Sequence, residues 1–189
     1  MAAECRNGIS VHGQTDPWEE RKEILFGQEL ARQARYVAGA DRELRAALAA
    51  GDADGTWYAV QCLLVAAANM SKILWPPAPE AEFGSRLRAW VGVDDTSPLR
   101  SRVLRNSFEH FGRELARWIR EHREDVLADA LISDFHPSEF LPHQLVLRHF
   151  EPRALAVSFL GERLDLEPLI AAARDVRQRL RDYSPGQYL

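Results

Sequence analysis

The chain has 189 residues, a formal net charge of -4 and 46% apolar residues. That length fits one domain, and the apolar share is enough for a hydrophobic core, which excludes disorder of the whole chain. The negative charge gives no overall attraction to nucleic acid or to an anionic membrane, so binding of that kind needs a local basic patch. Cys5 and Cys62 lie too far apart to predict a disulfide framework or a zinc site.

Residues 1–14 have no periodicity and are expected to form a flexible N-terminus. They do not combine a basic segment with an apolar one, as a secretory signal does. No apolar run along the chain predicts a membrane span. We therefore expect a cytoplasmic protein with reduced cysteines, no membrane association, no metal and no cofactor.

A first helix is predicted from Pro17 to about Gly51. Asp16 is a good capping residue, and proline suits the first helical position. Gly39 is a point at which this helix could break. The apolar residues that follow at helical spacing are Ile24, Leu30, Ala34, Val37, Ala38, Leu44 and Leu48. Residues 51–55 resemble a calcium loop but lack its glycine and its final glutamate, so they predict a turn.

Two more helices are predicted before the middle of the chain. One runs from Thr56 to Trp75, contains many alanines that allow close packing, and ends at the prolines that follow. A shorter one runs from Glu80 to Val91. After a loop over residues 92–97, a third long helix is predicted to begin near Pro98, with Thr96 or Ser97 as its cap.

The pattern changes after about Arg123. Residues 134–142 contain two prolines and mixed polarity, which predicts a loop or a broken helix. The apolar runs 144–150 and 154–160 flank Glu151-Pro152-Arg153 and predict a β-hairpin. A last helix is predicted from Glu167 to Asp182. Its apolar face is Leu169, Ile170, Ala173, Val176 and Leu180.

Residues 98–123 form a locally basic region, with seven arginines against three glutamates. On a helix of about 100° per residue, one arc of this region is apolar: Leu104, Phe108, Phe111, Leu115, Trp118 and Ile119. The opposite arc is a polar ridge of Asn106, His110, Arg113 and Arg117. Arg105 lies about 140° from His110 on the same wheel. A single helix therefore does not aim both side chains at one atom, whereas two helices meeting at a symmetric interface could.

Arg105-Asn106 followed by Glu109-His110, on a helix late in a helical chain, resembles the HEPN superfamily. The signature of that superfamily is an arginine, a polar residue, and a histidine after four to six intervening positions. The resemblance implies a mainly α fold, with an antiparallel helical bundle over residues 15–130. Residues 131–189 would be an extension of loop, hairpin and helix packed on that bundle. It also implies a homodimer in which the two motifs meet in a cleft.

Many members of the superfamily are metal-independent endoribonucleases, and the resemblance assigns roles on that basis. Arg105 would hold the scissile phosphate, while His110 would act as general acid or base and Asn106 would orient the site. Cleavage through the ribose 2′-hydroxyl requires RNA and leaves a 2′,3′-cyclic phosphate. The residues expected to support the site or to bind RNA are Glu109, Arg113, Arg117 and Lys72.

Alternatives remain open at this point. The domain could be a non-catalytic HEPN-like module that binds RNA or protein, as many members are. Arg113 and Arg117 could be a solvated helical face, and Lys72 a rim position on its helix. As a ribonuclease the protein could act as a toxin or in defence, with an antitoxin or regulatory protein as partner. Toxins modified by nucleotidyltransferase antitoxins carry a tyrosine two residues after the histidine, where this chain has Gly112.

Overall fold

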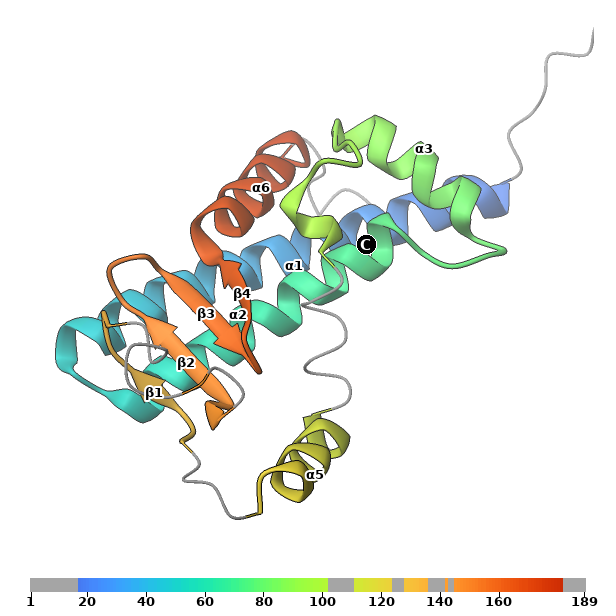
Figure 1. The fold of residues 1–189 in the computed structure, drawn as a ribbon. Helices are drawn as coiled ribbons and strands as arrows, with labels where there is room; N and C mark the ends of the chain where they lie inside the picture. The colour runs from blue at the N-terminus through green and yellow to red at the C-terminus, as the bar shows by residue number, and fades with distance from the viewer. Residues whose placement is uncertain (1–16, 102–110, 124–127, 136–141, 143–144, 182–189) are drawn as a thin grey trace, which may run out of the picture.

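The computed structural model describes residues 17–101, 111–123, 128–135, 142 and 145–181. Within these ranges the protein is mainly helical, with a small four-stranded sheet and a C-terminal helix (Figure 1), which confirms the predicted class. The helices are α1 (Pro17–Ala50), α2 (Ala53–Leu74), α3 (Ala81–Val91), the 3-10 turn η1 (Pro98–Arg100), α5 (Phe111–Glu121) and α6 (Leu166–Arg179). The strands are β1 (Leu131–Ile132), β2 (Arg148–Glu151), β3 (Ala156–Phe159) and β4 (Glu162–Asp165).

The two longest helices, α1 and α2, fold back on each other and form the centre of the molecule (Figure 1). Leu30, Val37 and Leu44 of α1 are buried at the spacing that the sequence predicts. A helix break at Gly39 is wrong, because α1 continues through it to Ala50. Glycine lowers helix stability but does not interrupt the hydrogen-bond ladder as proline does, and packing on α2 holds the helix together.

Asp52 begins α2 one turn earlier than predicted. Its side chain accepts a hydrogen bond from the backbone N–H of Gly55 at 2.9 Å, as an N-cap does. By length and a mean hydropathy of 1.2, α2 also meets the criterion for a membrane span, which the sequence analysis did not anticipate. More than half of that stretch is buried against the rest of the protein, as in a core helix.

The C-terminal helix α6 closes one side of the core. Its predicted apolar face is buried throughout, which confirms that part of the prediction. Arg179 also donates hydrogen bonds to the carbonyl oxygens of Val91 and Gly92 at the end of α3. Gly92 has φ +59, and a Cβ there would lie 1.7 Å from Nη1 of Arg179. The positive φ therefore favours glycine at this junction between α3 and α6, and any side chain there would also displace the Arg179 guanidinium.

The sheet has the order β1-β2-β3-β4, with β1 parallel to β2 and the other pairs antiparallel. The predicted hairpin is confirmed as β2 and β3, with Phe150 opposite Val157. The fourth strand, β4, was not predicted; it is mostly charged and lies at the edge of the sheet. It follows β3 through a two-residue turn, Leu160-Gly161, in which both residues have positive φ.

A continuous long helix from Pro98 is wrong, because the helical turn that begins there ends at Arg100. Ser101 has ψ 127, which ends the turn in an extended conformation. Leu99 is fully buried in the main core between α2 and α6, whereas α5 packs elsewhere, on the sheet. One straight helix could not place Leu99 in the main core and also pack the residues of α5 against the sheet.

Two hydrophobic clusters result. The main cluster joins α1, α2, α3 and η1 with apolar residues of β2, β3 and α6, so residues beyond 131 share the core of the helices. The second cluster contains Trp118 of α5 with Leu147 and Phe159 from the sheet region, and Phe111 and Leu115 pack against it. Ile119, expected on the same apolar arc, is 49% exposed, because the sheet covers only a narrow strip of α5.

Candidate functional site

The residues that carry the predicted chemistry, Arg105, Asn106, Glu109 and His110, lie outside the described residues. The structure therefore tests neither their geometry nor their roles. It does describe both flanks of that segment and the remaining predicted residues, Arg113, Arg117 and Lys72.

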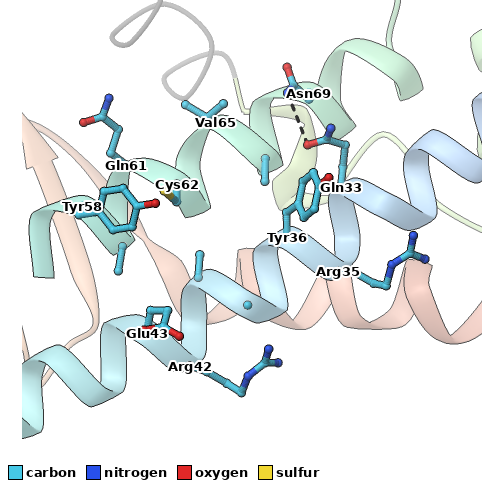
Figure 2. A pocket seen from close by; sticks show the side chains of 14 residues that line it. Gln33, Arg35, Tyr36, Arg42, Glu43, Tyr58, Gln61, Cys62, Val65 and Asn69 are labelled. Carbon is cyan, nitrogen blue, oxygen red and sulfur yellow. Dashed lines mark hydrogen bonds between the residues drawn. The ribbon is translucent and has the colours of Figure 1, made fainter. Parts of the chain in front are cut away.

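A groove of about 730 Å³ runs between α1 and α2 (Figure 2). Tyr36 and Tyr58 are 55% and 69% exposed on its two walls. The side-chain amide of Asn69 donates to Oε1 of Gln33 across it, at 3.4 Å. The hydrogen bond with Cys62 raises the pKa of Tyr58, and the charges of Cys62 and Glu43 act in the same direction. The groove thus combines exposed aromatic rings with a mainly apolar lining that includes the buried Ala40, Ala59 and Ala66.

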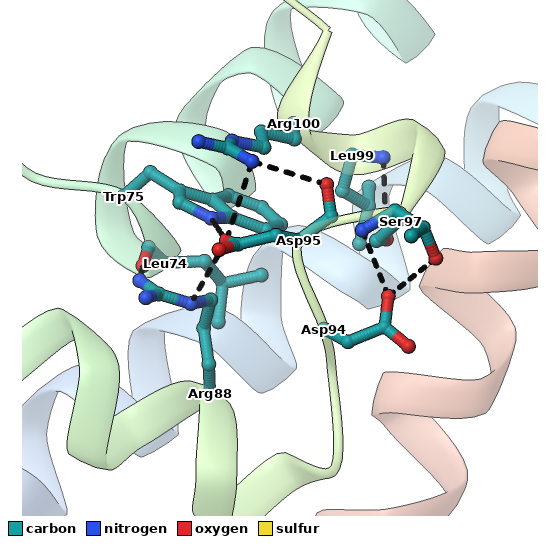
Figure 3. Close-up of polar contacts among 9 residues, drawn as sticks. Leu74, Trp75, Arg88, Asp94, Asp95, Ser97, Leu99 and Arg100 are labelled. Atoms are coloured by element: carbon teal, nitrogen blue, oxygen red, sulfur yellow. Dashed lines mark hydrogen bonds and ion pairs between the residues drawn. The ribbon is translucent and has the colours of Figure 1, made fainter.

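The N-terminal flank is fixed by a polar cluster around Asp95 (Figure 3). Trp75 Nε1 donates to Asp95 Oδ1 at 2.8 Å, and Arg88 Nε and Arg100 Nη1 lie 3.8 and 3.6 Å from the same oxygen. The Arg88 guanidinium also lies 5.4 Å from the centre of the Trp75 ring and donates to the carbonyl of Leu74. These contacts tie the end of α2, α3 and the loop before η1 to one point.

Both aspartates of this loop favour their charged forms. The hydrogen bond from Trp75 lowers the pKa of Asp95, and the charges of Arg100 and Arg88 add to this effect. Hydrogen bonds from Thr96 lower the pKa of Asp94. The loop is therefore negatively charged and internally paired at neutral pH, which suits it to hold the chain rather than to transfer protons.

On the C-terminal flank, α5 exposes Arg113 and Arg117 as the wheel predicts. Both guanidiniums pair with Glu114: Arg113 Nε lies 3.5 Å from Oε1, and Arg117 Nη2 donates to Oε2. The structure therefore brings Arg113 and Arg117 together through a shared carboxylate. Because this carboxylate neutralises part of their charge, the ridge is less basic than the count of arginines suggests.

Arg148 joins α5 to the rest of the protein. Its guanidinium makes two hydrogen bonds to Asp129, at 2.8 and 2.6 Å. It also lies 5.3 Å from the ring of Phe111 on α5 and 5.4 Å from the ring of Trp57 on α2. Burial raises the pKa of Asp129, but the hydrogen bonds and charge of Arg148 outweigh this and keep that pKa below its ordinary value. The hydrogen bond to Asp129 in turn raises the pKa of Arg148.

Lys72 lies on a different element from the two arginines. It is exposed in the last turn of α2, in step with the groove residues Tyr58, Cys62, Val65 and Asn69 at alternating spacings of four and three. Lys72 therefore lies on the groove side of α2, and the structure does not bring it together with Arg113 and Arg117 on α5.

His122 is a candidate that the sequence analysis did not single out. It follows Arg117 after four intervening residues, the same spacing as Arg105 and His110. Arg117 and His122 line a hollow of about 160 Å³ together with Trp118, Glu121 and Leu160. His122 Nδ1 lies 3.0 Å from the carbonyl of Trp118, and because a carbonyl oxygen only accepts, Nδ1 is the donor in this contact. The repeated spacing in the sequence was the signal that could have found it.

Within the described ranges, no group of three or more histidine, cysteine, aspartate or glutamate side chains is placed to hold a metal ion. His149 is buried, and its Nε2 lies 3.0 Å from the carbonyl of Ser133. That contact fixes the end of β1 against β2, which is a structural role.

Compared with known proteins, the chain matches no protein-family model, no curated protein and no solved structure.

Proposed function

We propose that this protein is a metal-independent endoribonuclease of the HEPN type. The observation that carries the proposal is the spacing of Arg105, Asn106 and His110 in the sequence, directly before a helix that exposes Arg113 and Arg117. Arginine is a permanent, bidentate phosphate ligand, and histidine exchanges a proton near neutral pH. Together they supply charge stabilisation and proton transfer without a metal ion.

In this proposal His110 takes a proton from the ribose 2′-hydroxyl or gives one to the leaving 5′-oxygen. The 2′-oxygen attacks the adjacent phosphorus, and the P–O5′ bond breaks. Arg105 neutralises the charge that develops on the phosphate oxygens, and Asn106 orients the site. The products are a 2′,3′-cyclic phosphate and a 5′-hydroxyl. Glu109, Arg113, Arg117 and Lys72 support the site or contact the RNA backbone.

The proposal extends to the assembly and its setting. Because a helical wheel would put Arg105 and His110 on different flanks, we propose a composite site completed by a second copy of the chain in a homodimer. The HEPN-like bundle of residues 15–130 would be its scaffold. We propose a cytoplasmic toxin or defence ribonuclease, with an antitoxin or another regulatory protein as a further partner.

The second candidate is a non-catalytic HEPN-like module that binds RNA or protein. One observation favours it: Glu114 pairs with both Arg113 and Arg117, so these two arginines are already engaged on their own helix. Such a module would retain RNA binding through the remaining arginines of residues 98–123 without any cleavage.

The test is incubation of the purified protein with end-labelled RNA in EDTA. We expect cleavage that leaves a cyclic phosphate and stops at any site whose 2′-hydroxyl is replaced by hydrogen. Binding without cleavage across several RNA substrates would reject the enzyme and leave the binding module. Cleavage that EDTA abolishes would reject the metal-independent mechanism.

A further inference from the structure

One exposed ridge of α1 is symmetric about a glycine. Arg35, Gly39 and Glu43 follow one another at intervals of four residues. At about 100° per residue, Arg35 and Glu43 lie about 40° to either side of Gly39. Both charged side chains are exposed, and all three residues line the α1 wall of the groove (Figure 2). The ridge therefore presents a positive charge, a gap and a negative charge in a row.

No packing among the described residues accounts for Gly39. Glycine inside a helix costs about 1 kcal/mol relative to alanine. At Gly27 a Cβ would lie 3.0 Å from the Trp90 ring, so the close packing of Trp90 explains that glycine. A Cβ at Gly39 would meet only Nη2 of Arg42, at 3.9 Å, which is an ordinary contact. Because no described residue fills the space beside Gly39, another molecule can approach the backbone of α1 closely at this point.

The two charged side chains of the ridge, Arg35 and Glu43, also lack ion-pair partners among the described residues. Elsewhere on α1, Arg32 pairs with Glu29, and Arg45 pairs with Asp41 and Glu167. Among the described residues, by contrast, neither Arg35 nor Glu43 makes a hydrogen bond or an ion pair. The ridge thus carries one unpaired charge of each sign, at equal distances from Gly39.

We propose that α1 docks against α1 of a second copy of this chain, antiparallel, with the two helices crossing at Gly39. Residues four apart form the ridges that align in the commonest class of helix packing, near an angle of about -50°. A two-fold axis through that crossing places Arg35 of one copy opposite Glu43 of the other, twice in the dimer. It also places Arg32 opposite Ala46, so a long side chain meets a short one.

The pairing of charges favours a second copy on this face. Arg35 and Arg42 both line the α1 wall of the groove, but Glu43 on the same wall would repel a phosphate backbone. A self-complementary ridge needs no other partner, because each copy supplies both members of each pair. Exposed Tyr36 and Tyr58 beside the ridge would gain cover at the rim of this interface.

Charge reversal tests the register. In sedimentation at micromolar concentrations without RNA, we expect the wild type to be a dimer. Arg35→Glu and Glu43→Arg should each weaken it by about tenfold or more, because like charges then face each other. The double variant Arg35→Glu/Glu43→Arg should return to within about threefold of wild type, because opposite charges face each other again. Arg174→Glu, an exposed reversal on α6, is the matched control and should dimerise normally.

Gly39→Leu tests the crossing point independently of charge. We expect a folded protein, with thermal stability equal to or above that of a monomeric Arg35→Glu variant, that no longer dimerises. A wild-type monomer, a double variant as weak as the singles, or a Gly39→Leu dimer would each overturn the proposal. Loss of folding in Gly39→Leu together with a wild-type monomer would show that the chain's own residues cover the ridge.

This interface can fail separately from RNA cleavage. If the charge-reversal pattern holds and no RNA is cleaved, the dimer stands and the proposed enzyme falls. If a monomeric Arg35→Glu variant cleaves RNA at the wild-type rate, the α1 interface stands and the composite site completed by a second copy falls.

Discussion

The α1–α2 pair and α5 are both amphipathic helices, but they are held very differently. Leu63, Leu64 and Met70 of α2 are at most 1% exposed, within a cluster that draws on helices and sheet alike. On α5 only Trp118 is classed as buried, and it packs against a small cluster at the sheet. The region next to the proposed catalytic motif is therefore the more weakly packed of the two. Local opening of such an element costs less than opening the core, and binding segments often have this property.

The largest expected effect is on the α1–α2 core. Leu64→Ala should lower the free energy of unfolding by about 2–5 kcal/mol, because the side chain is fully enclosed and leaves a cavity. Val65→Ala, on the exposed face of the same helix, is the control and should change it by at most about 0.5 kcal/mol. Urea denaturation followed by circular dichroism measures both. Equal losses in the two variants would contradict the burial of this helix.

A smaller effect is expected on α5. Phe111 is only half-buried, so Phe111→Ala should cost about 1–3 kcal/mol rather than the roughly 3–5 kcal/mol of a fully buried phenylalanine. Amide hydrogen exchange should speed up in α5 while exchange in α2 stays slow. Ile119→Ala should leave both unchanged. Faster exchange spread evenly over the whole protein would show that α5 and α1–α2 are one cooperative unit.

The contact between Asp129 and Arg148 should give a pH-dependent effect below about 1 kcal/mol, because the pair is partly exposed. The pKa of Asp129 is lowered in the folded protein, so its contribution is present above the ordinary pKa of about 3.9. That contribution is lost as the pH falls through the folded pKa. Asp129→Asn should therefore lose less stability than wild type between about pH 6 and 3. If denaturation midpoints show the same stability difference between wild type and Asp129→Asn at about pH 6 and about pH 3, this contact does not contribute in the predicted way.

The smallest effect is expected at Arg113, which already pairs with Glu114. Arg113→Ala should leave the rate of cleavage at saturating RNA within a few-fold of wild type. It should weaken RNA binding and reduce the salt dependence of binding by about one phosphate contact. Arg174→Ala on α6 should change neither quantity. A loss of cleavage as large as that of a catalytic variant would place Arg113 in the reaction itself.

The strength of packing also decides what the sequence could predict. Apolar residues at regular spacing predicted α1, α2 and α6 to within about a turn, because these helices bury whole faces. The hairpin followed from two apolar runs around Pro152. The strand β4 did not, because an edge strand needs few apolar residues and Leu160 is an unusual residue at positive φ. The break at Ser101 was also beyond reach, since it depends on where Leu99 and α5 are packed.

The candidate site was predictable in chemistry but not in placement. Spacing and the polar neighbour Asn106 selected Arg105 and His110, which lie outside the described residues. The same spacing recurs at Arg117 and His122, but there the residue after the arginine is Trp118. The exposure of Arg113 and Arg117 followed from the wheel, whereas their shared partner Glu114 required coordinates. Side-chain pairing on a helix surface depends on rotamers, which periodicity does not determine.

The repeated spacing supplies the most direct test of the proposed function. His110→Ala and His122→Ala remove the same side chain from two neighbouring Arg-x4-His pairs. In EDTA, His110→Ala should lower the cleavage rate by a factor on the order of 10² to 10⁴, the range for loss of a positioned acid or base. His122→Ala should cleave within a few-fold of wild type, and both variants should keep the circular dichroism of the folded protein. Equal rates for His110→Ala and wild type, or a larger loss in His122→Ala, would contradict the assignment of the catalytic histidine.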